Sequence, residues 1–256
     1  MKYEIKATPF PVVECRIERG ETLVSEGGAM AWMTPQIEMT TSGQGGFARL
    51  FSGENVFRNL YTANADNQLI AFGSSFPGRI LPIDVSEKAW IMQKSAFLAS
   101  EESVNFEVVF QKKFSTGLFG GEGFIMQRLS GRGIVFVEID GELIEYQLAA
   151  GQKIIVDTGN IAGYEETVQM DIQSVKGVKN KLFGGEGLFN TVLTGPGKIL
   201  LQTMPVRGLA QELIPYLPTN TSSNSKKEGR IRRPSFHFPR SAGRSHRSCR
   251  FRYNRF

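Results

Sequence analysis

The sequence predicts an all-β protein, and three observations support this prediction. Strand-forming and turn-forming residues are abundant, with 28 Gly and 19 Phe among 256 residues. Segments such as 104–108 and 167–172 alternate polar and apolar residues, which is typical of half-buried strands. A motif related to Leu-Phe-Gly-Gly-Glu-Gly begins at Leu50, Leu118 and Leu182, at spacings of 68 and 64 residues. These features predict three sequence-related β units of about 65 residues each.

The similarity between the units extends beyond the motif. Each motif follows a second related segment, at 29–32, 96–99 or 160–163, and precedes a turn sequence by 13 residues. In one of these turns, Gly131 and Gly133 supply the positive φ of a tight hairpin. One unit has room for about six strands but cannot bury its apolar face alone. We therefore expect a pseudo-threefold arrangement in which the units close on each other and cover exposed edges. The predicted repeats span about 1–75, 76–138 and 139–205.

One helix is predicted near the end of the β units. Apolar residues recur with helical spacing over 206–214, and Pro215 ends the pattern. We therefore expect a single domain over 1–218. Beyond it, 219–256 is predicted to be a polar linker and a basic disordered tail.

Charge is divided unevenly between this tail and the rest of the chain. Residues 226–256 hold eleven Lys and Arg and one acid, a net charge of +10, whereas the remainder has 19 basic against 24 acidic residues, a net charge of −5. Three interpretations of the tail stay open. It is an arm that binds nucleic acid through arginine and aromatic residues, an anchor to a membrane surface, or an extension outside the natural protein.

Residue usage argues against an enzyme. Both histidines, His237 and His246, lie in the tail, so the predicted domain cannot build a Ser-His-Asp triad, a Cys-His pair or a histidine metal site. Its one cysteine, Cys15, alternates with Val13 and Ile17, which indicates a buried strand residue. We expect no catalytic residue, metal or cofactor. Without a disulfide framework, a signal peptide or a long apolar run, a cytoplasmic location is expected, with peripheral contact to the membrane.

The glycine-rich loops are the candidate interaction sites. A phosphate-binding loop is rejected because no Lys-Ser or Lys-Thr and no helix follow the last glycine. In one interpretation the glycines form bulges and each glutamate binds free backbone amides. In a second, the three glutamates converge to bind a cation or a basic partner, and in a third the flanking phenylalanines form an apolar contact surface. The candidate residues are Phe51, Gly53, Glu54, Phe119, Gly120, Gly121, Glu122, Gly123, Phe183, Gly184, Gly185, Glu186 and Gly187.

Two further sets of residues invite interpretation. Trp32 and Trp90 are predicted to anchor the core. The adjacent pairs Glu101–Glu102 and Glu165–Glu166 are not expected to act as acid and base, because neighbouring residues of a strand face opposite ways.

The three loop motifs, with 29–32, 117–123 and 181–187, resemble the mitochondrial biogenesis AIM24 (altered inheritance of mitochondria) family over about residues 1–218. The sequence looks like a bacterial relative of that family, and the basic tail departs from the family pattern. The resemblance implies a β-helix-like fold similar to the trp RNA-binding attenuation protein (TRAP), and it implies no established catalytic activity. Fold similarity alone does not carry RNA binding across.

Two functional hypotheses follow. The first is a non-enzymatic binding or scaffold protein that contacts an unknown protein partner or a membrane surface. The second is a regulator that binds RNA, suggested by the fold analogy and the basic tail and weakened by the acidic domain.

Overall fold

The computed structural model describes residues 1–41, 58–112, 123–174, 189–213 and 216. They belong to the compact unit Met1–Leu217. They form antiparallel sheets, the short 3-10 segments η2 (Lys94–Ala96) and η3 (Thr158–Asn160), and one helix, α2 (Val206–Leu213). The predicted all-β fold with a short C-terminal helix is confirmed, although Ile214 lies outside the described residues.

The described strands that follow β1 (Lys2–Lys6) fall into three consecutive sets of six. The first set is β2 (Val12–Ile17), β3 (Thr22–Ser25), β4 (Met30–Met33), β5 (Ile37–Thr41), β6 (Asn59–Ala63) and β7 (Gln68–Gly73). The second is β8 (Gly78–Asp84), β9 (Trp90–Gln93), β10 (Phe97–Glu101), β11 (Val104–Lys112), β12 (Phe124–Gly131) and β13 (Ile134–Asp140). The third is β14 (Leu143–Leu148), β15 (Lys153–Asp157), β16 (Ile161–Glu165), β17 (Gln169–Ser174), β18 (Phe189–Thr194) and β19 (Gly197–Gln202).

The same pairing pattern occurs in each set. In the first set β7 pairs with β2 and β4, and β6 pairs with β3 and β5. The corresponding strands of the other two sets pair in the same way. Neighbouring sets are joined because β3 pairs with β10 and β9 pairs with β16. We call these pairings the first and second junctions.

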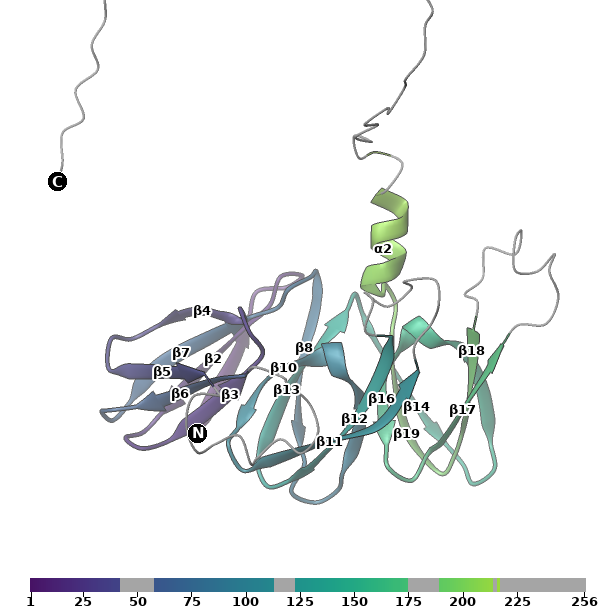
Figure 1. The fold of residues 1–256 in the computed structure, drawn as a ribbon, viewed down its shortest axis with the longest axis horizontal. Coiled ribbons are helices and arrows are strands. Elements are labelled where there is room, and N and C mark those ends of the chain that lie inside the picture. Colours follow the sequence, from purple (N-terminus) through teal and green to yellow (C-terminus); the bar gives the residue numbers. More distant parts are fainter. Residues whose placement is uncertain (42–57, 113–122, 175–188, 214–215, 217–256) are drawn as a thin grey trace, which may run out of the picture. The chain divides into compact units, whose positions relative to one another are not determined.

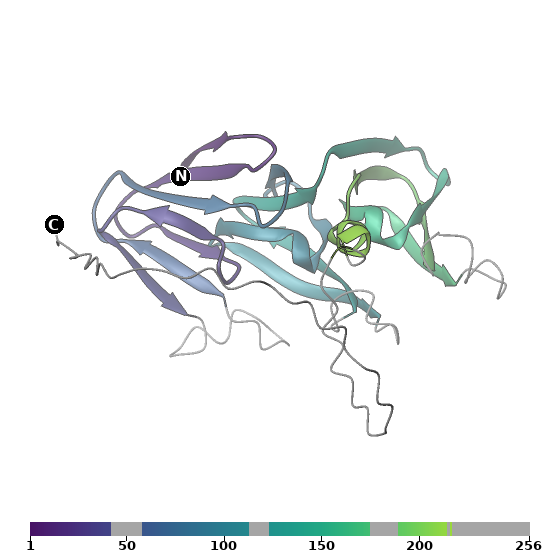
Figure 2. The same cartoon turned by 90° about the horizontal axis from the view of Figure 1, so that it is seen from above.

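The two junctions link the strands into a series of four sheets. Their strand orders are β1-β2-β7-β4, β5-β6-β3-β10-β13-β8, β11-β12-β9-β16-β19-β14 and β15-β18-β17. Figure 1 shows the series from the purple and blue strands around β4 and β7 to the green strands β17 and β18, and the view from above gives the same order (Figure 2).

Among the described strands, the series is open at both ends. The end strands β4 and β15 belong to different sheets, so the expected closure of the units does not occur between them. A pseudo-threefold axis, a TRAP-like arrangement and an origin in one repeated unit stay predictions.

Local irregularities also recur at matching places. A β-bulge inserts one extra residue into a strand and sharpens its twist. The register shifts between Met30 and Trp32, between Phe97 and Ala99, and between Ile161 and Gly163. The predicted positive φ is confirmed at Gly131 (+103°) and Gly133 (+111°).

The buried core crosses the junctions. In one cluster Tyr61 and Phe72 of the first set share the interior with Leu98 and Phe136 of the second. Other clusters join the second and third sets in the same way. The sets are therefore held together by apolar burial as well as by backbone hydrogen bonds.

The two tryptophans that were predicted to anchor the core differ in burial. Trp90 is buried, as predicted. Trp32 is 46% exposed, so its prediction as a core anchor is wrong. The physical reason is its position on β4, an end strand that no neighbouring set covers.

Cys15 has the predicted strand position. It is buried between Val13 and Ile17 on the inner face of β2. Burial, followed by the negative charge of Glu101, raises the pKa of the thiol to about 12. The cysteine therefore stays protonated and unreactive near neutral pH.

At the second junction, the packing leaves no room for a side chain at Gly163. A Cβ atom there would overlap Met92 Sδ and lie 2.8 Å from the carbonyl oxygen of Ile91. We expect Gly163→Ala to lower the free energy of unfolding by about 1–3 kcal/mol, because the junction is overpacked. Urea unfolding provides the measurement. Gly208→Ala in α2, where nothing lies within 4 Å of the new Cβ, is the matched control and should not destabilise the protein. Equal losses in both variants would contradict this account of the junction.

Candidate functional site

The predicted interaction loops lie almost wholly outside the described residues. Residues 42–57, 113–122 and 175–188 contain every candidate except Gly123. Gly123 directly precedes β12 and has a φ of +89°, which suits a glycine in a tight turn. The three interpretations of these loops therefore stay predictions.

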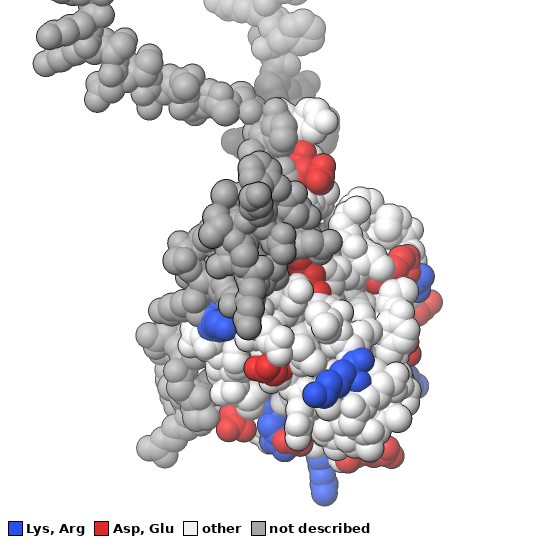
Figure 3. Space-filling model, turned by 90° about the vertical axis from the view of Figure 1, so that its right-hand side faces the viewer, with Lys and Arg blue, Asp and Glu red and all other residues white. Residues whose placement is uncertain are grey.

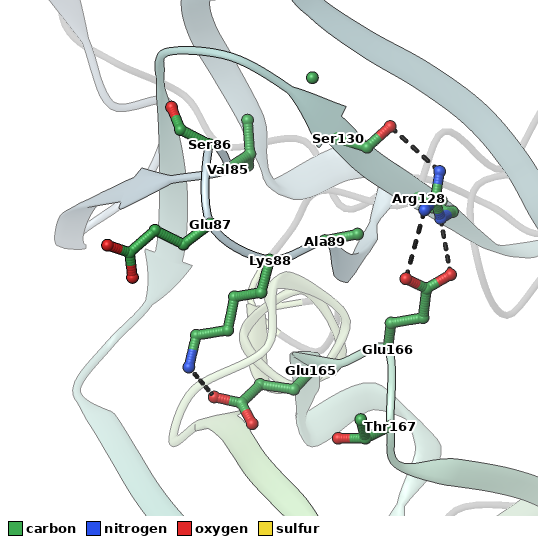
Figure 4. A pocket seen from close by; sticks show the side chains of 11 residues that line it. Val85, Ser86, Glu87, Lys88, Ala89, Arg128, Ser130, Glu165, Glu166 and Thr167 are labelled. Atoms are coloured by element: carbon green, nitrogen blue, oxygen red, sulfur yellow. Dashed lines mark hydrogen bonds and ion pairs between the residues drawn. The ribbon is translucent and has the colours of Figure 1, made fainter.

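The described residues form a cleft of ≈ 440 Å³ at the second junction. It is bordered by the loop Val85–Ala89 before β9, the end of β12, and the turn 165–167 after β16. The strand pairing of β9 with β16 brings these segments together, although they are far apart in sequence. Figure 4 shows their side chains converging around the opening.

Two ion pairs line this cleft. The Lys88 ammonium donates to Glu165 Oε1 at 2.6 Å. The Arg128 guanidinium donates to both carboxylate oxygens of Glu166, from Nε at 2.7 Å and from Nη2 at 3.2 Å. The two neighbouring glutamates thus face separate cations (Figure 4). The prediction that they face opposite ways assumed that both lie in a strand, but β16 ends at Glu165 and Glu166 lies in the turn that follows.

Glu165 also has a structural contact. Its Oε2 atom accepts a hydrogen bond from the backbone amide of Lys198, at 3.1 Å. Glu101 in the second set accepts from the amide of Ile134 in the same way, at 2.8 Å. In the first set Thr34 Oγ1 accepts from the amide of Leu69, at 3.2 Å. All three side chains satisfy the backbone amide at the start of the neighbouring strand.

A second cleft, of ≈ 460 Å³, occupies the matching place at the first junction. It is bordered by 20–23 around the start of β3 and by 101–103 after β10. Here the Met1 ammonium lies 3.3 Å from Glu21 Oε1 and 4.0 Å from Glu101 Oε1. The two clefts are therefore charged hollows produced by the same junction geometry.

Both glutamates of this cleft have lowered pKa values. Burial raises the pKa of Glu165, but hydrogen bonds from Lys88 and from the Lys198 amide outweigh it, so the pKa lies below its ordinary value. The hydrogen bond from Arg128 likewise lowers the pKa of Glu166. A catalytic acid or base needs a pKa near the working pH, and both shifts go the other way. Among the described residues, no group of three or more His, Cys, Asp or Glu could hold a metal ion.

Sequence reasoning missed the cations of this cleft. Lys88 and Glu165 are 77 residues apart, and Arg128 and Glu166 are 38 apart. No local spacing predicts such contacts. The only available signal was the repeat itself, which aligns Glu165 with Glu101.

The fold and the clefts define a class of all-β protein built from strand sets joined edge to edge. The chain belongs to the mitochondrial biogenesis AIM24 family, whose model matches residues 3–204. The resemblance seen in the sequence is thereby confirmed.

Two comparisons place the chain beside streptococcal proteins. It is 28% identical over 236 residues to an uncharacterized protein of Streptococcus pyogenes serotype M6, covering 87% of this chain and 93% of the relative. A crystal structure of a Streptococcus pyogenes protein from a structural genomics consortium matches with a TM-score of 0.71 and 24% identity, covering 84% of this chain and 99% of that chain. That second likeness shows a shared fold.

The lowered pKa of Glu165 predicts a pH-dependent contribution to stability. The ionised carboxylate is favoured in the folded state, so its contribution is fully present above the ordinary glutamate pKa of about 4.3 and is lost as the pH falls through the lower folded pKa. We expect Glu165→Gln to reduce the free energy of unfolding by about 1 kcal/mol at neutral pH, and by less at pH values below the folded pKa.

Urea unfolding at neutral and acidic pH measures this difference. The matched control is Glu87→Gln, a change to an exposed side chain in the same cleft. It should have little effect at either pH. A loss for Glu165→Gln that stays constant across the pH range would contradict the assigned role of the charge.

Proposed function

We propose that this protein is a non-enzymatic binding or scaffold protein that contacts a protein partner or a membrane surface. One observation carries the proposal: large apolar side chains are exposed on the edge strands of all four sheets. The exposed residues on these strands are Tyr3, Ile5, Trp32, Met39, Val108, Val109, Ile144, Tyr146 and Ile155.

Edge strands are chemically suited to binding. An edge presents unpaired backbone N–H and C=O groups that can pair with an added strand. Exposed apolar side chains beside such groups add buried area to the contact. On β14, for example, Ile144 and Tyr146 lie two residues apart and are 41% and 49% exposed. They therefore present one apolar face at the edge of the third sheet.

The charged residues support the same proposal. At the second junction, the ion pairs with Lys88 and Arg128 lower the pKa values of Glu165 and Glu166, which suits recognition better than acid-base chemistry. The proposed location is the cytoplasm, with peripheral membrane contact when the partner is a lipid surface. No helix among the described residues is long and apolar enough to cross a membrane.

Binding of RNA by the described sheets has less support. A nucleic-acid site requires clustered lysine and arginine. Figure 3 views the end that carries β17 and β18, and on its described surface acidic and basic residues are interspersed rather than gathered by sign. The basic residues 226–256, which carry the RNA hypothesis, lie outside the described residues.

Site-specific photo-crosslinking in cells tests the proposal. A photoreactive amino acid replaces Tyr146, or Gln147 on the opposite face of the same strand as the matched control. We expect adducts from position 146 that exceed those from position 147, because the apolar face makes the contact. Mass spectrometry identifies each adduct as protein, lipid or nucleic acid.

Protein or lipid adducts specific to position 146 would support the proposed function, and nucleic-acid adducts would favour the RNA hypothesis. Equal yields from the two positions would contradict a role for the apolar edge.

A further inference from the structure

The two end strands of the series have open edges where their counterparts are paired. By its place in the pairing pattern, β15 corresponds to β3 and β9, and β4 corresponds to β10 and β16. The edges of β3 and β10 form the first junction, and those of β9 and β16 form the second. Among the described strands, β15 pairs only with β18 and β4 pairs only with β7.

The burial of side chains shows that these edges are uncovered junction surfaces. Ile155 on β15 is 67% exposed, whereas its counterparts Val24 and Ile91 are 3% and 7% exposed. Over the whole of β4 the side chains are half-buried or exposed, whereas the first four residues of both β10 and β16 are buried. The edge shared by β3, β9 and β15 is thus buried on the first two strands and exposed on β15. The edge shared by β10, β16 and β4 is buried on the first two strands and exposed on β4.

The open edges are complementary. An edge of the β3 type meets an edge of the β10 type in antiparallel register at both junctions. The chain ends with a free edge of the first type on β15 and a free edge of the second type on β4. β15 belongs to the sheet of β17 and β18, at the opposite end of the series from β4 (Figure 1), so within one copy the strand order leaves the two edges apart.

We infer that β15 of one copy pairs with β4 of a second copy, so that the chains assemble head to tail through a third junction like the two within each chain. This inference goes beyond the proposed function because the partner is the chain itself, and it does not depend on an external ligand. The contact joins two different surfaces, so each added copy leaves one free edge of each type. Assembly therefore continues until a ring closes or the copies run out.

The internal junctions fix the register of the new one. Val24 is opposite Ser100 at the first junction, and Ile91 is opposite Tyr164 at the second. The corresponding residues at the third junction are Ile155 and Met33. Directly opposed residues of antiparallel strands have Cα atoms about 4.5–5.5 Å apart, which lies within the range that a disulfide bridges.

Cysteine crosslinking between separate copies tests the register. Chains with Met33→Cys are mixed with chains with Ile155→Cys. Both variants also carry Cys249→Ser, which removes one native cysteine, and the other, Cys15, is fully buried. We expect a disulfide-linked pair of chains that contains one copy of each variant. The matched control replaces Met33→Cys by Met39→Cys, a 49% exposed position on the edge strand β5. That mixture should crosslink at least tenfold less, because β5 corresponds to strands that are edges in every set.

The mass of the full chain in solution, followed by light scattering at increasing concentration, provides an independent readout. We expect masses of two or more copies, and we expect Ile155→Lys to weaken assembly about tenfold or more by placing a charge in the junction. Because Ile155 is exposed in one copy, this change should leave the fold intact, as circular dichroism can verify. Met39→Lys is the control and should assemble normally.

Three results would overturn the inference. The chain could stay monomeric at all concentrations, or Ile155→Lys could leave assembly as strong as before. In the crosslinking experiment, the Ile155→Cys variant could react equally with the Met33→Cys and Met39→Cys variants. A chain carrying both Met33→Cys and Ile155→Cys supplies the last discriminating result. A disulfide formed within that one chain, with none between the separate variants, would show closure on itself instead.

Discussion

The structure depends on backbone pairing between consecutive strand sets. Each set divides its six strands between two sheets, and the two middle sheets exist only because β3 meets β10 and β9 meets β16. A set by itself would leave an apolar face and two edges in water, which is unfavourable on both counts. The shared sheets bury the apolar face and pair the edges. The core residues Leu98 and Phe136 of the second set complete the interior of the first.

The charged features follow from the same pairing. When β9 and β16 come together, the loop before one strand meets the turn after the other, and Lys88 comes within 2.6 Å of Glu165. The first junction brings Glu21 and Glu101 to the matching place. The clefts and their ion pairs are therefore products of the junctions. The proposed function is therefore one of binding, and the open edges of the end strands bear on it as much as the clefts do.

The fold could be predicted from the sequence to the extent that local patterns determine it. Alternation identified β11 and β17, glycine pairs identified the hairpin before β13, and the apolar spacing identified α2. What local patterns could not supply was the partner of each edge. Trp32 has the residue type of a core anchor and is exposed because its strand ends the series. Likewise, ion pairs such as Lys88–Glu165 depend on which strands meet, and the motif loops that carried most predicted site residues lie outside the described ranges.

Native-state amide hydrogen exchange tests the central claim most directly, because it reports the opening of individual strands. If the junctions hold the sets together, the amides of Val24 and Ile91 should exchange only through global unfolding, as slowly as those of the buried core residue Phe136. In dilute protein, the amide at Ile155, the matching residue of the open strand, should exchange at least tenfold faster. Junction amides that exchange independently of the core, as fast as those of β15, would contradict the account.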